Sequence, residues 1–149
     1  MGRKSKIAAV VLSISVFLGG CSLGKTDIVF TTGLSANEVF KIEHEKVSLA
    51  EALSTSDVVS IHLPVNEETR GMIGAAQFAK MKPTAMLINT ARGPIVEEAA
   101  LVDALTTGKI ATAGLDTYEH EPLPKDHPLL TLDNVVASAH AGGNTKDND

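Results

Sequence analysis

Short apolar runs alternate with helix-like stretches from residue 48 onward, and this alternation limits the fold more than any other feature of the sequence. We expect strands at 57–64, 85–88, 110–115 and 135–138, and helices that start at Ser48 and span 75–81 and 97–107. Strands separated by helix-length segments pair in parallel through right-handed crossovers. The pattern therefore predicts an α/β chain that forms half of a doubly wound parallel sheet with short crossover helices.

The composition limits the chain to one domain core and excludes several kinds of partner. It has 149 residues, of which 44% are hydrophobic and 21% are charged. The net charge of -5 leaves no basic face for a phosphate backbone, so we expect no nucleic-acid binding. A single cysteine excludes an internal disulfide framework, and the histidines show no metal-ligand spacing, so we expect no metal site.

The first 24 residues differ from the rest of the chain. Three basic residues precede an apolar run at 7–17, which is too short to span a bilayer comfortably. The sequence LGGC that follows resembles the lipobox of bacterial lipoproteins, in which the cysteine is lipidated. We therefore expect residues 1–24 to be a lipoprotein-like signal segment that anchors the chain to the cell membrane through lipidated Cys21. The alternative is a buried apolar start helix with an ordinary buried cysteine.

Four polar residues lie just beyond the ends of predicted strands: Arg92, Asp116, Glu121 and His140. The carboxyl ends of parallel strands meet at one edge of the sheet, where α/β proteins bind ligands. Each residue also has an ordinary interpretation, because an arginine can form a surface ion pair, a histidine can be structural and Asp116 can cap a turn. Glu119 competes with Glu121, since both flank the same histidine.

Residues 47–146 resemble the later part of the nucleotide-binding domain of NAD-dependent D-2-hydroxyacid dehydrogenases. The matching segments are SDVVSIHLPVNEETRGMIG, MKPTAMLINTARGPIVEEAALVDAL, AGLDTYEHEPLP and NVVASAHAGGNT. The resemblance implies a partial Rossmann-like NAD-binding domain over 47–149, preceded by a junction at 25–46. It also implies NAD as cofactor, with NADP left open, a small 2-hydroxy or 2-keto acid as substrate, and a homodimer.

By the same resemblance, three residues would be catalytic. Arg92 would grip the substrate carboxylate, His140 would exchange the substrate proton, and Glu121 would orient the histidine. These residue types suit the chemistry, since arginine binds a carboxylate through two hydrogen bonds and histidine can exchange a proton near neutral pH. The resemblance also implies a cofactor pocket lined by His62, Leu63, Pro64, Thr90, Ala91, Arg92, Asp116, His140, Ala141, Gly142 and Gly143.

Some parts of the family pattern are missing from this sequence. It contains no G-x-G-x-x-G, the loop whose backbone amides would hold the cofactor's pyrophosphate, and no substrate domain. We therefore expect a truncated or fused oxidoreductase segment that transfers hydride between NAD(H) and a small 2-hydroxy or 2-keto acid. The alternative is a non-catalytic, lipid-anchored or dimerising interaction protein. The leader predicts a membrane location, whereas the dehydrogenase family predicts a cytoplasmic one.

Overall fold

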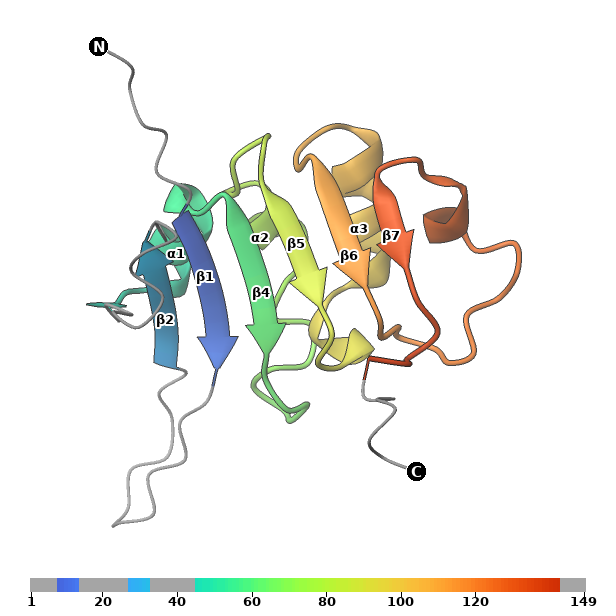
Figure 1. The fold of residues 1–149 in the computed structure, drawn as a ribbon, viewed down its shortest axis with the longest axis horizontal. Helices are drawn as coiled ribbons and strands as arrows, with labels where there is room; N and C mark the ends of the chain where they lie inside the picture. Colours follow the sequence, from blue (N-terminus) through green and yellow to red (C-terminus); the bar gives the residue numbers. More distant parts are fainter. Residues whose placement is uncertain (1–7, 14–26, 33–44, 143–149) are drawn as a thin grey trace, which may run out of the picture.

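The computed structural model describes residues 8–13, 27–32 and 45–142, which form a seven-stranded sheet with helices against it (Figure 1). The strands are β1 (Ala8–Ser13), β2 (Asp27–Thr32), β3 (Glu45–Lys46), β4 (Val58–His62), β5 (Met86–Asn89), β6 (Thr112–Leu115) and β7 (Val135–Ala137). The α-helices are α1 (Leu49–Thr55), α2 (Ala75–Phe78) and α3 (Glu98–Thr106), and the 3-10 helices are η1 (Gly93–Ile95) and η2 (Pro128–Thr131). The strand order is β3-β2-β1-β4-β5-β6-β7.

Strands β4 to β7 confirm the predicted parallel sheet. Each pairs in parallel with the next strand along the chain, so the four lie side by side in sequence order. The other end of the sheet differs from the prediction. There β1 is parallel to β4, but β2 and β3 add antiparallel pairs, so the whole sheet is mixed. Antiparallel neighbours need no crossover helix, and for this reason the helix–strand pattern does not predict them.

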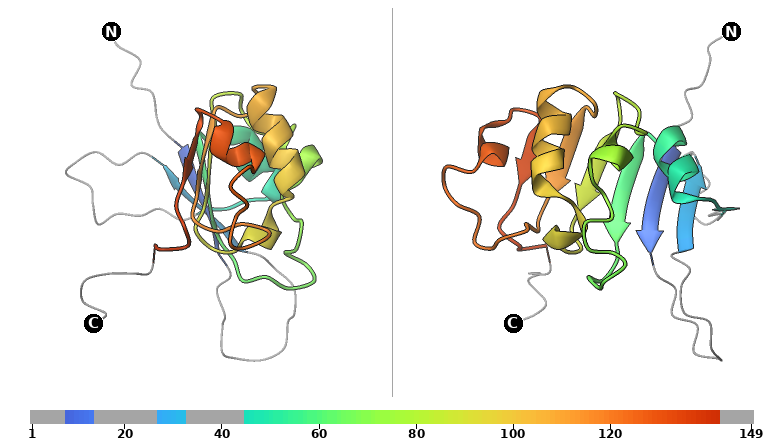
Figure 2. Two further views of the ribbon diagram at one scale, coloured as in Figure 1. Left: turned by 90° about the vertical axis from the view of Figure 1, so that its right-hand side faces the viewer. Right: turned by 180° about the vertical axis from the view of Figure 1, so that it is seen from behind.

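Helices α1, α2 and α3 all lie on one face of the sheet (Figure 2). This arrangement follows from the crossovers, because successive right-handed connections in one direction place their helices on the same side. Every second residue of β4 and β5 points into this layer, so Val59, Ile61 and Leu87 are buried against the helices. Phe78 and Leu101 are buried there as well. The core therefore lies between the sheet and a single layer of helices.

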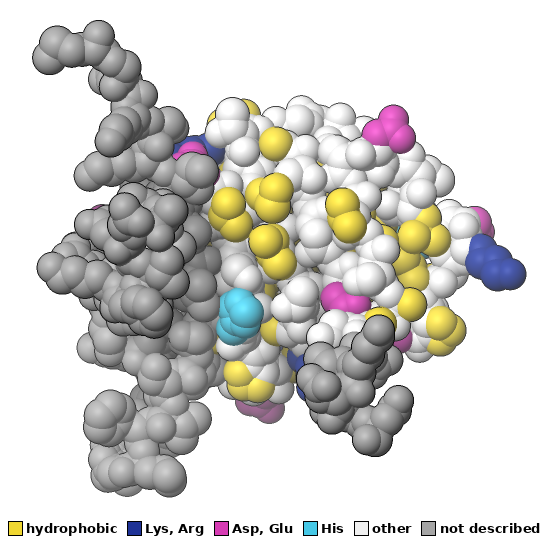
Figure 3. All heavy atoms as spheres, in the orientation of Figure 1, with side chains coloured by type: hydrophobic (Ala, Val, Ile, Leu, Met, Phe, Trp, Pro, Cys, Tyr) yellow, Lys and Arg dark blue, Asp and Glu magenta, His cyan; other side chains and the backbone are white. Residues whose placement is uncertain are grey.

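The opposite face of the sheet has no helix of the described residues on it (Figure 2). Met86 on β5 is 37% exposed, and Val136 on β7 is 74% exposed. Apolar side chains lie scattered over this face in the space-filling view (Figure 3). A sheet buries both of its faces only when helices cover both, so Met86 and Val136 remain exposed on this one.

The predicted starts of the helices agree with the structure better than their predicted ends do. The Ser48 hydroxyl accepts a hydrogen bond from the Glu51 amide at 3.2 Å, which caps α1 as the sequence predicts. The predicted helix at 75–81 ends at Phe78, because the amides of Lys80 and Met81 bond to carbonyls three residues back instead of four. Neither 3-10 helix was predicted, and both have proline in the first turn.

The first described strand falls within the stretch assigned to the leader. Residues 8–13 form β1, so the alternative of an apolar start helix is wrong for these residues. Cys21 lies outside the described residues. No helix in the described ranges is long and apolar enough to cross a bilayer.

Candidate active site

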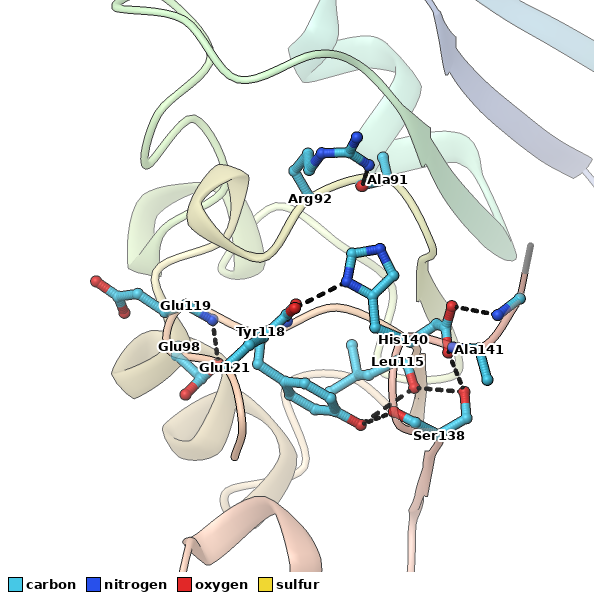
Figure 4. A network of polar contacts seen from close by, with 12 residues as sticks. Ala91, Arg92, Glu98, Leu115, Tyr118, Glu119, Glu121, Ser138, His140 and Ala141 are labelled. Atoms are coloured by element: carbon cyan, nitrogen blue, oxygen red, sulfur yellow. Dashed lines mark hydrogen bonds and ion pairs between the residues drawn. The ribbon is translucent and has the colours of Figure 1, made fainter. Parts of the chain in front are cut away.

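The candidate site lies at the carboxyl ends of β5, β6 and β7. Arg92 follows β5, Asp116 follows β6, and His140 follows β7, so parallel pairing brings them to one edge of the sheet. Glu121 reaches the same place from the loop after β6 (Figure 4). The structure therefore gathers the four polar residues that the sequence singled out.

His140 and Glu121 form a direct pair. The His140 Nδ1 atom lies 2.8 Å from Glu121 Oε2, and the Tyr118 amide donates to Glu121 Oε1 at 3.0 Å. These hydrogen bonds, that of His140 first, lower the pKa of Glu121. The ionised carboxylate accepts a hydrogen bond from Nδ1, so Nδ1 carries the ring proton. Nε2 is then the nitrogen that can exchange a proton with a ligand. In Figure 4 this second nitrogen points to the side on which Arg92 lies.

Asp116 holds the turn that carries His140. Its carboxylate accepts hydrogen bonds from the Ser138 hydroxyl at 2.6 Å and from the amides of Ala141 and Gly142, both at 2.9 Å. These bonds, the one from Ser138 above all, lower the pKa of Asp116. They also fix His140 in a left-handed backbone conformation with φ of 53°. Few residues other than glycine adopt this conformation, and its cost is tolerated where surrounding contacts hold the turn.

Arg92 is presented by a second fixed turn. The buried Asn89 side chain at the end of β5 donates to the Arg92 carbonyl at 3.0 Å and accepts from the Ala91 amide at 3.1 Å. The guanidinium is exposed and donates to the Ala91 carbonyl at 2.6 Å. Within residues 45–142, Arg92 forms no ion pair with a carboxylate. Its remaining donors are thus directed to solvent, where an anionic ligand can meet them.

A cavity of about 550 Å³ lies beside Arg92, at the ends of β4 and β5. It is lined by His62, Leu63, Pro64, Val65, Ala91 and Arg92. All except Val65 were predicted to line a cofactor pocket. Its lining is mixed, because apolar side chains such as Leu63 and Pro64 stand beside the polar groups of His62 and Arg92.

The other described residues that were predicted to line the cofactor pocket lie outside this cavity. Thr90 is exposed at the end of β5, and Ala141 and Gly142 belong to the turn bound by Asp116. Gly143 lies outside the described residues, as does Cys21. Among the described residues, no group of three or more potential metal ligands comes together.

Three residues that support the site were not singled out from the sequence. Asn89 closes the Arg92 turn, and the Tyr118 hydroxyl donates to the Ser138 carbonyl at 2.7 Å beneath the His140 turn. Gly93 packs so closely that a Cβ atom there would overlap the Tyr118 carbonyl group. A polar residue that ends an apolar strand is a signal that could have identified Asn89, but the roles of Tyr118 and Gly93 depend on contacts across the fold.

The fold and the site together define an α/β protein of the Rossmann-like, dinucleotide-binding class. Residues 23–142 match the family model described as D-isomer specific 2-hydroxyacid dehydrogenase, NAD binding domain. The chain therefore belongs to this family, as the resemblance of its sequence predicts, and the matched region is the NAD-binding domain.

Relatives and solved structures agree with this membership. The chain is 57% identical over 93 residues to a glyoxylate/hydroxypyruvate reductase B of Klebsiella pneumoniae, covering 62% of this chain and 29% of the relative. It is 54% identical over 97 residues to a glyoxylate reductase of Korarchaeum cryptofilum, covering 65% and 29%. A D-lactate dehydrogenase with NAD+ from Lactobacillus jensenii superposes with a TM-score of 0.64 at 39% identity, over 66% of this chain and 34% of that one. The chain thus spans about a third or less of these proteins.

Proposed function

We propose that this chain is a segment of a D-2-hydroxyacid dehydrogenase type of oxidoreductase, which acts on a small 2-hydroxy or 2-keto acid with NAD(H). The observation that carries the proposal is the His140–Glu121 pair, 2.8 Å apart, on the sheet edge that also carries Arg92. A proton-exchanging histidine beside a carboxylate, close to an arginine, suits the interconversion of a keto acid and a hydroxy acid.

His140 and Glu121 would handle the proton. Glu121 keeps the imidazole oriented through Nδ1, so Nε2 donates a proton to the keto oxygen during reduction and accepts it during oxidation. The carboxylate also stabilises the positive charge on the protonated imidazole. Because the pKa of Glu121 is lowered, the carboxylate remains ionised well below neutral pH and is available throughout this exchange.

Arg92 would bind and orient the substrate. A guanidinium forms two parallel hydrogen bonds to a carboxylate, which sets the direction of the substrate as well as its position. The Asn89 contacts hold the backbone of this turn in place. Lysine could supply the charge but not the paired hydrogen bonds.

The residues present fit one part of an NAD site. The cavity formed by 62–65 with Ala91 and Arg92 has a mixed lining, in which apolar side chains could contact a ring of the cofactor and Arg92 and His62 could contact its polar groups. Bound NAD(H) supplies hydride transfer to or from the substrate carbon. The sequence has no glycine-rich loop to bind the pyrophosphate, so we expect affinity well below that of a complete dinucleotide site.

NADH binding to the full chain tests this proposal. Isothermal titration calorimetry from micromolar to millimolar cofactor should give saturable binding, and NADPH in parallel tests the choice of cofactor. A folded chain that binds neither nucleotide would contradict the proposal. If NADH binds, the next assay is reduction of glyoxylate, hydroxypyruvate and other small 2-keto acids.

The role of Arg92 is tested by Arg92→Ala. Because the guanidinium is exposed, its loss opens no core cavity, and the free energy of unfolding should change by less than about 0.5 kcal/mol. Any 2-keto acid reduction should be lost, while NADH binding in calorimetry should weaken far less. Activity retained by the variant would contradict the role given to Arg92.

A second candidate is a non-catalytic, lipid-anchored interaction protein, favoured by the LGGC sequence ending at Cys21. The two candidate functions use residues 8–13 differently. Cleavage before Cys21 would remove these residues, and with them β1, from the sheet. Expression in a bacterial host with and without globomycin, which blocks lipoprotein processing, tests it. A longer precursor of the unaltered chain that appears only with globomycin, together with a Cys21→Ala chain that stays at the longer length with and without the drug, would support lipidation. An unaltered chain that stays unprocessed under both conditions would argue against it.

A further inference from the structure

Glu98, the first residue of α3, lies outside the site described above but is connected to it. Its side chain is only 14% exposed, and its two carboxylate oxygens have different partners. Oε2 accepts a hydrogen bond from the Glu119 amide at 3.0 Å, and Oε1 lies 3.0 Å from His127 Nε2. Glu98 thus binds two points of the loop that follows β6, one on each side of Glu121.

The hydrogen bonds of His127 define what it offers to Glu98. Its Nδ1 atom accepts from the Leu129 amide at 3.3 Å, so the ring proton resides on Nε2 and is donated to Glu98. His127 also precedes η2, which places it at the end of the loop. The carboxylate of Glu98 therefore anchors the far end of the loop through His127 and its near end through the backbone.

The near end of this loop, at residues 118–119, is the part that contacts the Glu121–His140 pair. The Glu119 amide bound by Glu98 is next to the Tyr118 amide, which donates to Glu121 Oε1 at 3.0 Å (Figure 4). Two neighbouring amides are thus held by two carboxylates, one from α3 and one from the loop itself. Movement of the backbone at 118–119 would shift the donor on which the Glu121 position depends.

We infer that Glu98 is a positioning residue, which sets the geometry of the Glu121–His140 pair by holding the 118–119 backbone and His127. Glu98 contacts neither Glu121 nor His140 directly, and it acts on them through the backbone of Tyr118 and Glu119. The inference rests on the proposed function, because it concerns the pair to which proton exchange is assigned there.

Two conservative variants separate geometry from charge. Glu98→Asp keeps the negative charge but shortens the side chain by one methylene, so the carboxylate cannot span both partners. Glu98→Gln removes the charge and the acceptor for His127 Nε2, but it keeps an oxygen that can accept from the Glu119 amide, the contact next to Tyr118. Asp103→Asn is the matched control, since it lies on the same helix and loses only a surface ion pair with Lys109.

The readout is the pKa of the Glu121 carboxyl, measured by carbon-13 NMR titration of the full chain. Loss of positioning weakens the Tyr118 and His140 hydrogen bonds, so Glu98→Asp should raise this pKa toward its ordinary value. Glu98→Gln and Asp103→Asn should leave it unchanged or slightly lower, because removing a negative charge favours ionisation of a neighbouring carboxyl. A purely electrostatic role for Glu98 predicts no change in Glu98→Asp, because that variant keeps the negative charge, so Glu98→Asp distinguishes the two roles.

The outcomes are unambiguous. A rise in Glu98→Asp alone supports the inference. No change in Glu98→Asp, or an equal rise in Glu98→Gln, overturns it. The titration needs neither cofactor nor substrate, so a chain that titrates as expected but fails to bind NADH overturns the proposed function and leaves this inference standing.

Discussion

At the residue scale, the site depends on a few polar side chains that hydrogen-bond to the backbone of its turns, and on Gly93, where there is no room for a side chain. Asp116 and Asn89 each bind two or more groups of the turns that present His140 and Arg92. Both are buried, where a polar group without partners would be costly, and their bonds satisfy them. Precision in the site therefore comes from backbone turns held by buried polar side chains.

The Gly93→Ala substitution should damage both the fold and the site. The added methyl group would overlap the carbon and oxygen of the Tyr118 carbonyl, and backbone atoms cannot move aside as a flexible side chain would. We expect a loss of about 1–3 kcal/mol in the free energy of unfolding. Urea denaturation followed by circular dichroism measures it. Gly114→Ala is the control, because its nearest neighbour lies 4.0 Å away and its stability should be nearly unchanged.

Asp116 should make the fold sensitive to acid. Its folded pKa lies below the ordinary value of 3.8, so the ionised form stabilises the folded state at pH above that value. This contribution is lost as the pH falls through the lower folded pKa. Thermal melts from pH 7 to pH 2.5 should therefore show a smaller acid-induced fall in Tm for Asp116→Asn than for the unaltered chain. An equal fall of Tm with decreasing pH in the two proteins would contradict this role of Asp116.

At the scale of elements, the candidate site residues Arg92, Asp116 and His140 follow strand ends, whereas two of the residues that support them, Gly93 and Glu98, begin helices. The two 3-10 helices lie in the connections after β5 and β6, the same connections that carry Arg92 and Glu121. Glu98 shows how α3 still contributes, because its first turn reaches the loop that carries Glu121. A helix start thus supports the site without touching a ligand.

The N-terminal cap of α1 offers a simple test of local stability. Ser48→Ala removes the hydroxyl that accepts from the Glu51 amide, and we expect a loss of about 1 kcal/mol. Ser54→Ala, within the same helix, removes a hydroxyl bonded only to a carbonyl that the helix can satisfy, so it should have a smaller effect. Chemical denaturation of the two variants measures the difference. Equal losses would show that the cap contributes nothing specific.

At the scale of the whole molecule, the sheet is covered by helices on one face and carries exposed apolar residues on the other (Figures 2 and 3). Exposed apolar surface of this kind favours association, and the family resemblance implies a homodimer. We therefore expect the chain to self-associate at micromolar to millimolar concentration, with the open face as one contributor.

Charge on the open face should oppose this association. Met86→Glu and Val136→Lys place charges at two exposed apolar positions, so both should shift sedimentation velocity profiles toward monomer. Glu67→Lys changes the charge of an exposed residue in the turn after β4 and serves as the control. Profiles that stay the same in the first two variants would exclude this face from the contact.

The sequence by itself determined the parallel sheet, the approximate positions of its strands and the residues gathered at its carboxyl edge. Periodicity and helix-length spacing are local properties, and parallel pairing brings strand ends together whatever the details of packing. Only the tertiary structure decided that β2 and β3 add antiparallel strands, that Met86 is exposed, and that Asn89, Gly93, Tyr118 and Glu98 support the site. These outcomes depend on contacts between segments far apart in the chain, which no local pattern encodes.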